Sequence, residues 1–204
     1  MSRHLKHAGL RDLTCTVNIG LLVSLICGAA AGGEVRRPVS ALAYSADGKV
    51  LAIAADRSVL LYDRAMQKVT TTLGPIENPI NALAFSPDSR SLAAAEGTAG
   101  EQGTVRLWTL GRPESRTIDG HEDSVYAVAF DPAGQRIATA SYDRLAMLWK
   151  AADGSPQQTL KHHTGAVFGL AWSPDGKFLA TVSADTTVKI WSAESGQRLV
   201  TLTE

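Results

Sequence analysis

Cysteine is almost missing from this sequence, and its two cysteines, Cys15 and Cys27, both lie near the N-terminus. The chain therefore cannot build an internal disulfide framework or a cysteine-rich metal site. An excess of charge of one sign is missing too, because 20 Lys and Arg residues balance 20 Asp and Glu residues in a chain of 204. A balanced chain is not drawn to nucleic acid or to an anionic membrane by its charge. We expect neither as a partner.

A long apolar run is also lacking. The stretch from about Val17 to Ile26 is mostly apolar, but it is too short to span a bilayer comfortably. Basic residues precede it and small residues follow it, which is the order of a secretory signal peptide. We expect residues 1–31 to be a signal peptide that is cleaved after Ala31, with an uncleaved N-terminal membrane anchor as the alternative. The mature protein is then periplasmic or extracellular, and after cleavage it has no stable membrane insertion.

Helical periodicity does not occur after the leader, but short alternating runs do, and they recur with a period of about 40 residues. Each run of this kind leads into a turn-like tetrapeptide, and these tetrapeptides begin at Ser45, Ser86, Asp131 and Ser173. Each period holds four short apolar runs, and the third run ends in an aromatic residue: Tyr62, Trp108, Trp149 or Trp191. Four runs separated by Gly, Pro and Asp turns predict a four-stranded antiparallel meander.

The predicted fold is all-β, with one domain over residues 32–204. Its four units span about 36–74, 78–118, 121–160 and 163–202. A single meander of this size cannot bury both of its faces, so the units are expected to stack face to face as the blades of a propeller.

Two of the units carry a more specific pattern. His121 precedes Trp149 by 28 residues, and His163 precedes Trp191 by the same number. With Gly120 before His121, Lys150 after Trp149 and Ser192 after Trp191, these units resemble the GH…WD repeats of the WD40 β-propeller family, of the exported bacterial type. The resemblance covers about residues 36–204. It implies blades of a propeller that usually has about seven, so four units predict an incomplete or open propeller, part of a larger one. Completion by oligomerisation and a compact four-blade ring are the alternatives.

The resemblance also implies a structural role for a recurring set of polar residues. In this family the Asp before the third strand bonds the His, the His bonds a hydroxyl on the second strand, and the hydroxyl meets the Trp indole. The predicted tetrads are His121, Ser141, Asp143 and Trp149 in unit three, and His163, Ser183, Asp185 and Trp191 in unit four. Thr139 and Thr181 lie on the same strand faces as the two serines, so the choice of hydroxyl is left open.

Catalytic, cofactor and metal sites are not expected. A Ser, His and Asp set that recurs in two units is typical of a structural device, because hydrolysis needs only one triad, and no G-x-S-x-G elbow is present. His162 and His163 are adjacent on an extended segment, so their side chains diverge. The glycines of the segment 97–103 lack the Lys-Ser/Thr of a phosphate-binding loop.

The remaining function is recognition by a surface. In the WD40 family, the face formed by the loops before the first strand and between the second and third strands often binds partners. On that face we expect Ser124, Tyr126, Tyr142, Phe168 and Asn81. We therefore predict a non-catalytic scaffold that binds other proteins, with self-association possible through exposed blade faces. The alternative is a sensor or regulatory portion of a larger exported enzyme or cytochrome-containing redox protein.

Overall fold

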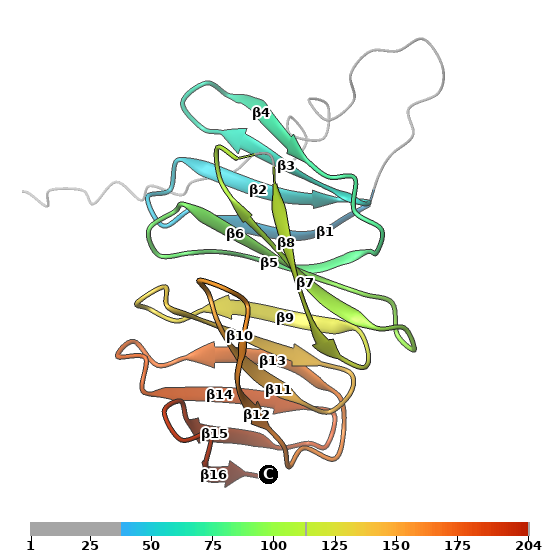
Figure 1. Ribbon diagram of the computed structural model, residues 1–204, viewed down its shortest axis with the longest axis vertical. Coiled ribbons are helices and arrows are strands. Elements are labelled where there is room, and N and C mark those ends of the chain that lie inside the picture. The colour runs from blue at the N-terminus through green and yellow to red at the C-terminus, as the bar shows by residue number, and fades with distance from the viewer. Residues whose placement is uncertain (1–37, 113, 204) are drawn as a thin grey trace, which may run out of the picture. The chain divides into compact units, whose positions relative to one another are not determined.

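The structure is a computed structural model whose described residues are 38–112 and 114–203, so the expected signal peptide at 1–31 lies outside them. Sixteen strands and no helix occur in these ranges. They form four separate four-stranded sheets, and in each sheet the strands pair in the order in which they occur in the chain (Figure 1). The predicted all-β fold of four antiparallel meanders is confirmed.

The first two sheets are blade 1 and blade 2. Blade 1 contains β1 (Val39–Tyr44), β2 (Val50–Ala55), β3 (Ser58–Asp63) and β4 (Lys68–Leu73). Blade 2 contains β5 (Ile80–Phe85), β6 (Ser91–Glu96), β7 (Gly103–Thr109) and β8 (Ser115–His121). Strand β8 runs three residues beyond the predicted end of the second unit, because His121 pairs with Gly103 across the sheet.

The other two sheets are blade 3 and blade 4. Blade 3 contains β9 (Val125–Phe130), β10 (Arg136–Ser141), β11 (Ala146–Lys150) and β12 (Pro156–Leu160). Blade 4 contains β13 (Val167–Trp172), β14 (Phe178–Ser183), β15 (Val188–Ser192) and β16 (Arg198–Leu202). The aromatic residues that mark the period all lie in the third strand of their blade, as the alternating runs predicted.

The turn between the first and second strands shows why the tetrapeptide recurs. In blade 4 the Ser173 hydroxyl donates to Asp175 at 2.6 Å and accepts the Phe178 amide at 2.9 Å. The Gly176 amide donates to the Ser173 carbonyl at 2.9 Å, and Gly176 has a φ of 69°, which glycine adopts without strain. The Ser, Asp and Gly of the motif therefore close this turn locally.

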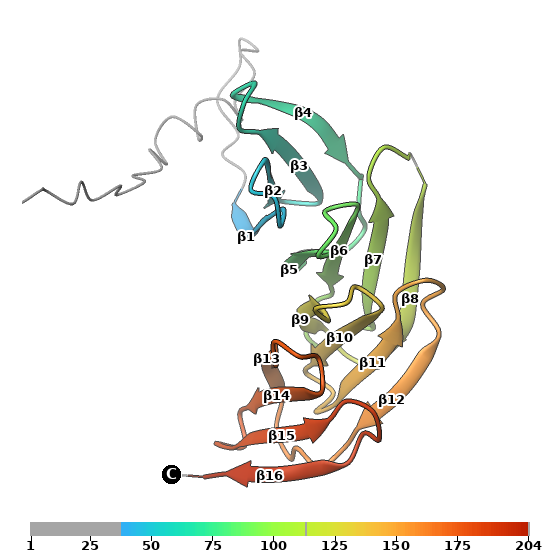
Figure 2. The same cartoon turned by 90° about the vertical axis from the view of Figure 1, so that its left-hand side faces the viewer.

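Three apolar cores lie between consecutive blades. Each core joins small residues of one blade to the aromatic third-strand residue of the next, which is Trp108, Trp149 or Trp191. The first strands β1, β5, β9 and β13 follow one another as neighbours (Figure 2). The sheets described here do not close into a ring, so blade 1 and blade 4 each keep one face without a neighbouring blade. None of the described elements is a helix that could cross a membrane.

Candidate protein-interaction face

The first strand of every blade carries a β-bulge at the same point. The register between the first and second strands skips one residue near the start of the first strand. The skipped residues are Ser40 in blade 1, Asn81 in blade 2, Tyr126 in blade 3 and Phe168 in blade 4. A bulge frees its extra residue from the ladder and re-aims the side chain. Because the four first strands are neighbours, the bulges set these side chains at one end of adjacent strands.

An aromatic cluster forms where two of these bulges meet. The ring of Tyr126 lies 5.5 Å from that of Phe168 in an edge-to-face arrangement and 6.1 Å from that of Tyr142, as measured between centroids. Tyr142 comes from the turn after β10. Tyr126 is half-buried, whereas Tyr142 and Phe168 are 45% and 47% exposed. The structure thus brings together the three aromatic residues that the sequence placed on the partner-binding face.

The two polar residues predicted for this face bond inside the protein. Ser124 is only 1% exposed, so its prediction as a surface residue is wrong. The side-chain nitrogen of Asn81 lies 3.0 Å from the Ser124 hydroxyl, 2.9 Å from the Val125 carbonyl and 3.0 Å from the Gly97 carbonyl. Asn81 is half-buried and joins blade 2 to blade 3. The Ser124 carbonyl in turn accepts the Tyr142 amide at 3.0 Å, which fixes the backbone of the aromatic cluster.

Polar chains connect His to Trp in blades 3 and 4. His121 Nδ1 lies 2.7 Å from Asp143 and its Nε2 lies 2.7 Å from the Thr139 hydroxyl, which also accepts the Trp149 indole N–H at 2.9 Å. The same three contacts in blade 4 measure 2.8 Å each. They join His163 to Asp185 and, through Thr181, to Trp191.

The hydroxyls of these chains belong to threonine, and the assignment of Ser141 and Ser183 to the tetrads is wrong. Ser141 donates to the Asp123 carbonyl at 2.8 Å and accepts the Asp143 amide at 3.2 Å. Ser183 makes the equivalent bonds to the Gly165 carbonyl and the Asp185 amide. Each serine lies two residues nearer the turn than the threonine, so it bonds the turn backbone and not the ring of the histidine.

The electrostatics of the blade 4 chain fix its protonation. Burial lowers the pKa of His163, although Asp185 opposes the shift, so the neutral imidazole is favoured. Burial alone would raise the pKa of Asp185, but hydrogen bonds from Thr187, His163 and the Thr164 backbone hold it well below its usual value. His163 Nδ1–H therefore donates to an ionised carboxylate and Nε2 accepts from Thr181. The Thr181 hydroxyl is buried and already bonded on both sides, which suits a structural link and not a nucleophile.

Blade 2 has a different buried polar pair, which the sequence analysis missed. The Glu96 side chain is fully buried, and Arg106 Nε donates to it at 2.8 Å. Burial raises the pKa of Glu96, and the hydrogen bond from Arg106 opposes this shift. Two features of the sequence could have indicated this pair. Glu96 is a charged residue at the end of an otherwise apolar run, and Arg106 lies two residues before Trp108. Lys189 holds the same position before Trp191 and is also buried.

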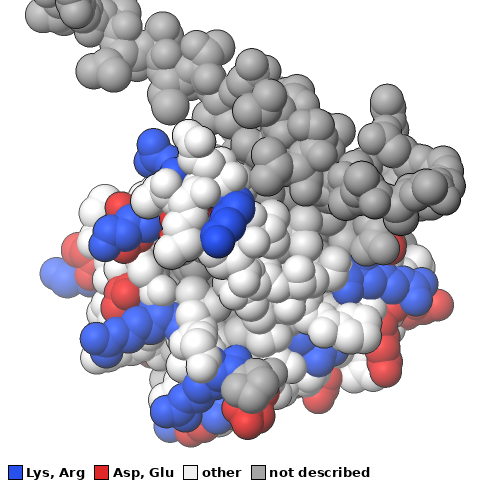
Figure 3. Space-filling view, turned by 90° about the horizontal axis from the view of Figure 1, so that it is seen from above, with Lys and Arg blue, Asp and Glu red and all other residues white. Residues whose placement is uncertain are grey.

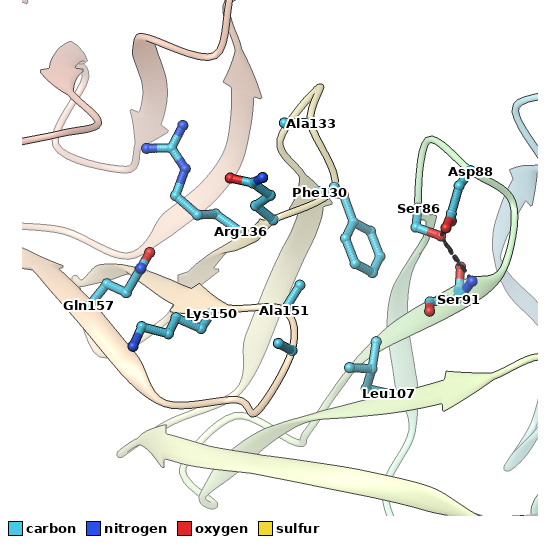
Figure 4. Close-up of a pocket in the computed structure, with 13 residues that line it drawn as sticks. Ser86, Asp88, Ser91, Leu107, Phe130, Ala133, Arg136, Lys150, Ala151 and Gln157 are labelled. Carbon is cyan, nitrogen blue, oxygen red and sulfur yellow. Dashed lines mark hydrogen bonds between the residues drawn. The ribbon is translucent and has the colours of Figure 1, made fainter.

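An open cleft of about 560 Å³ lies between blades 2 and 3 (Figure 4). Ser86, Asp88 and Leu107 line it from blade 2, and Phe130, Arg136 and Lys150 line it from blade 3. Asp88 accepts the Ser86 hydroxyl at 2.6 Å, and Arg136 bonds Asp131 at 2.9 Å and the Gly176 carbonyl at 2.7 Å. These charged groups serve turns and blade contacts, and we assign no ligand to the cleft.

Metal ligation has no support in the described part of the chain, where no group of three or more His, Cys, Asp or Glu residues could hold an ion. The adjacent histidines are directed differently. The His162 ring stacks on Trp191 with its centroid at 6.2 Å, whereas His163 bonds Asp185 and Thr181.

Comparison with known proteins gives the same picture of repeats. The family described as "WD domain, G-beta repeat" (WD40) matches residues 32–63, 67–109, 112–150 and 154–192. An uncharacterized WD repeat-containing protein of Synechocystis is 34% identical over 60% of this chain and 34% of its own length. Protein HIR1 of Mycosarcoma maydis is 42% identical over 22% of this chain and 4% of its own. A probable cytosolic iron-sulfur protein assembly protein, Ciao1 of Culex quinquefasciatus, is 37% identical over 28% and 18%. The chain thus spans about a third or less of these relatives.

Proposed function

Because the chain belongs to the WD40 family, whose fold is generally a non-enzymatic scaffold, we propose that it is a non-catalytic scaffold that binds another protein through the Tyr126–Tyr142–Phe168 cluster. The observation that carries this proposal is the exposure of two large aromatic rings at one end of the first strands. Aromatic side chains are enriched at the energetic centres of protein interfaces. Association with a second copy through the open faces of blades 1 and 4 is the second part of the proposal.

The support for a protein partner is the chemistry of the cluster. Tyr126 is half-buried and packs edge to face on Phe168, whose ring is 47% exposed. Rigid aromatic rings lose little conformational entropy when they are covered, which favours binding. Basic residues do not contribute to the cluster, and the chain carries no net charge that would favour a polyanion.

The test is a pull-down from envelope extract with the wild-type chain and the triple variant Tyr126→Ala, Tyr142→Ala and Phe168→Ala. Each truncation of a hot-spot residue is expected to weaken binding by about 1–2 kcal/mol. The matched control is Leu199→Ala, because Leu199 is as exposed as Phe168 but lies in the outer strand β16. Circular dichroism checks that both variants fold. A folded triple variant that retains every partner contradicts the proposal.

Export is a separate part of the proposal, supported by the basic, apolar and small-residue order of the first 31 residues. The expected mature chain begins at Gly32. Intact-mass analysis of the protein from its host tests this, and a cytosolic chain that retains Met1 contradicts it.

A further inference from the structure

The aromatic cluster of Tyr126, Tyr142 and Phe168 carries hydrogen-bonding groups as well as rings. The ring of Tyr126 contacts both other rings, with centroid distances of 5.5 and 6.1 Å. Within the described ranges, 38–112 and 114–203, neither tyrosine hydroxyl has a hydrogen-bond partner, and no fully buried side-chain nitrogen or oxygen lacks one. The hydroxyl of the half-buried Tyr126 is therefore at the surface. The cluster thus combines ring faces with two hydroxyls that can donate to a ligand.

Asn81 adds an oriented acceptor beside the cluster. Its side-chain nitrogen has three oxygen neighbours at 2.9–3.0 Å, and one of them is the carbonyl of Val125, the residue before Tyr126. Three oxygen neighbours require the nitrogen to face inward, which fixes the amide orientation and turns Oδ1 away from them. Oδ1 has no partner among the described residues, so this half-buried side chain keeps it at the surface. Two donors and one acceptor therefore surround the rings.

Exposure of one aromatic ring does not by itself make this combination. Figure 3 views the molecule from the blade 1 end, where much of the described surface is uncharged and Lys and Arg lie mainly toward its border. Tyr44 of blade 1 is 49% exposed, about as much as Phe168, but among the described residues it packs on no second aromatic ring. Tyr44 is therefore a matched exposed tyrosine outside the cluster.

The common modes of peptide recognition need different surfaces. Strand addition needs the open edge of a sheet, whereas the cluster consists of side chains. A bound helix needs apolar anchors spread over about two turns, roughly 10 Å, whereas the cluster is compact because Tyr126 contacts both other rings. Recognition of a phosphorylated segment needs clustered Arg, and none of the three residues is basic. A polyproline II segment needs aromatic rings with hydrogen-bond donors beside them, which the cluster provides.

The hydrogen-bonding groups of the cluster match such a segment. Proline has a carbonyl but no backbone N–H, and a polyproline II chain makes no internal hydrogen bonds. Its carbonyls are therefore available to the hydroxyls of Tyr126 and Tyr142. A residue between prolines supplies one N–H, which suits Asn81 Oδ1. The segment is also extended before it binds, so it loses little conformational entropy, and a cluster of only three rings suits a partner of this kind.

We propose that the aromatic cluster binds a polyproline II segment of a partner protein. Prolines cover the rings of Tyr142 and Phe168, the tyrosine hydroxyls donate to carbonyls of the segment, and one N–H between prolines donates to Asn81. This inference rests on the proposed function and deepens it, because it names the kind of segment that the scaffold binds.

The first test is calorimetric titration of the full chain with three synthetic peptides of equal length. One is proline-rich with a central alanine, the second has N-methylalanine in place of that alanine, and the third consists of glycine and serine. The alanine peptide is expected to bind. The N-methylalanine peptide is expected to bind about 2–10-fold more weakly because it cannot donate to Asn81, and the glycine–serine peptide is expected not to bind. Changing the peptide leaves the bonds between Asn81 and blade 3 intact.

The second test uses variants of the chain with the alanine peptide. Tyr142→Phe keeps the ring and removes one hydroxyl, so we expect the dissociation constant to rise about 2–10-fold. Tyr44→Phe is the same change outside the cluster and is expected to have no effect. Phe168→Ala removes a ring that prolines cover, and the expected rise is about 5–30-fold. Circular dichroism checks that each variant folds.

Binding of the alanine peptide that Tyr142→Phe and Phe168→Ala weaken and Tyr44→Phe does not supports the inference. Wild type that does not bind this peptide, or that binds the glycine–serine peptide as tightly, overturns it. An N-methylalanine peptide that binds as tightly as the alanine peptide overturns the contact with Asn81. The scaffold proposal fails separately: if the triple Ala variant loses its partner but wild type binds none of the peptides, only the polyproline inference is contradicted.

Discussion

Blade 4 holds its third-strand tryptophan with a buried chain of hydrogen bonds, whereas blade 2 has an ion pair beside its tryptophan. Trp191 donates to Thr181, but blade 2 has Ala94 at the position of Thr181, so Trp108 finds no hydroxyl there. Blade 2 buries Glu96 beside Arg106. Blade 4 therefore holds its tryptophan through a histidine and a threonine hydroxyl, with an ionised Asp185 that also lies 3.9 Å from the buried Lys189 ammonium. Blade 2 has no such hydroxyl and buries a carboxylate against a guanidinium.

The difference shows how a repeat can lose its polar signature and keep its fold. Blade 2 is joined to blade 3 by further side-chain hydrogen bonds. The Asn81 side chain donates to the Ser124 hydroxyl and the Val125 carbonyl, and the Gly100 amide donates to Asp123. Trp108 is as buried as Trp191 and lies in the core with blade 1. The apolar contact is thus common to the blades, and the polar groups around it are exchangeable.

The largest effect is expected from Asp185→Ala. Asp185 accepts from His163 and Thr187 and lies 3.9 Å from the buried ammonium of Lys189, so its removal leaves a buried cation without its carboxylate. The expected loss of stability is about 3–5 kcal/mol. Asp143→Ala in blade 3 is expected to cost less, about 1–3 kcal/mol, because Met147 stands where blade 4 has Lys189.

Chemical denaturation measures both losses, with Gln102→Ala in the exposed loop of blade 2 as a control of little expected effect. Equal losses for Asp185→Ala and Gln102→Ala would argue against the hydrogen-bond chain of blade 4.

A smaller effect is expected from Thr181→Val, which keeps the shape of the side chain and removes the hydroxyl. The Trp191 indole N–H and His163 Nε2 then lose their partner, at a cost of about 1–3 kcal/mol. Ser183→Ala is the matched change two residues away. Hydrogen exchange at the Trp191 indole distinguishes them, because only Thr181→Val is expected to accelerate it. If only Ser183→Ala accelerates exchange at the Trp191 indole, the hydroxyl that accepts the indole N–H belongs to Ser183 and not to Thr181.

The two blades are expected to respond to pH in opposite directions. The pKa of His163 is below its usual 6.5, so the unfolded chain takes up the proton first as the pH falls. The stability that His163 contributes is therefore complete above 6.5 and is lost as the pH falls through the lowered pKa. The pKa of Glu96 is above its usual 4.5. Its contribution is complete below 4.5 and is lost as the pH rises through the raised pKa.

Urea unfolding of wild type, Glu96→Gln and His163→Gln across about pH 4–8 measures these two responses. Relative to wild type, Glu96→Gln is expected to gain stability as the pH rises, and His163→Gln as it falls. If the free energy of unfolding of both variants changes with pH as it does in wild type, the expected opposite pH responses of blades 2 and 4 are contradicted.

The sequence predicts the strands and the tetrad framework because both follow from spacing. It could not separate Thr181 from Ser183, since a period of two sets both on one face and only the distance to the histidine ring decides. Ser124 is buried and Asn81 is directed inward because the bulge and the long loop of blade 2 bring two blades together, and a bulge becomes visible only when strands are paired. The pairing of Glu96 with Arg106 likewise depends on the register of β6 and β7 across that loop.

The smallest effect is expected in the long loop of blade 2. Asp123 accepts the Gly100 amide at 2.8 Å, and this bond ties the segment 97–103 to blade 3. Asp123→Ala removes it at an exposed site, so the expected cost in global stability is about 0.5–1.5 kcal/mol. Backbone hydrogen exchange is expected to accelerate at Gly100 and not at Thr187, which lies in the turn between β14 and β15. The Thr187 amide donates to Asp185 within the same blade. If Asp123→Ala accelerates exchange no more at Gly100 than at Thr187, the loop of blade 2 is held by its own backbone and not by the neighbouring blade.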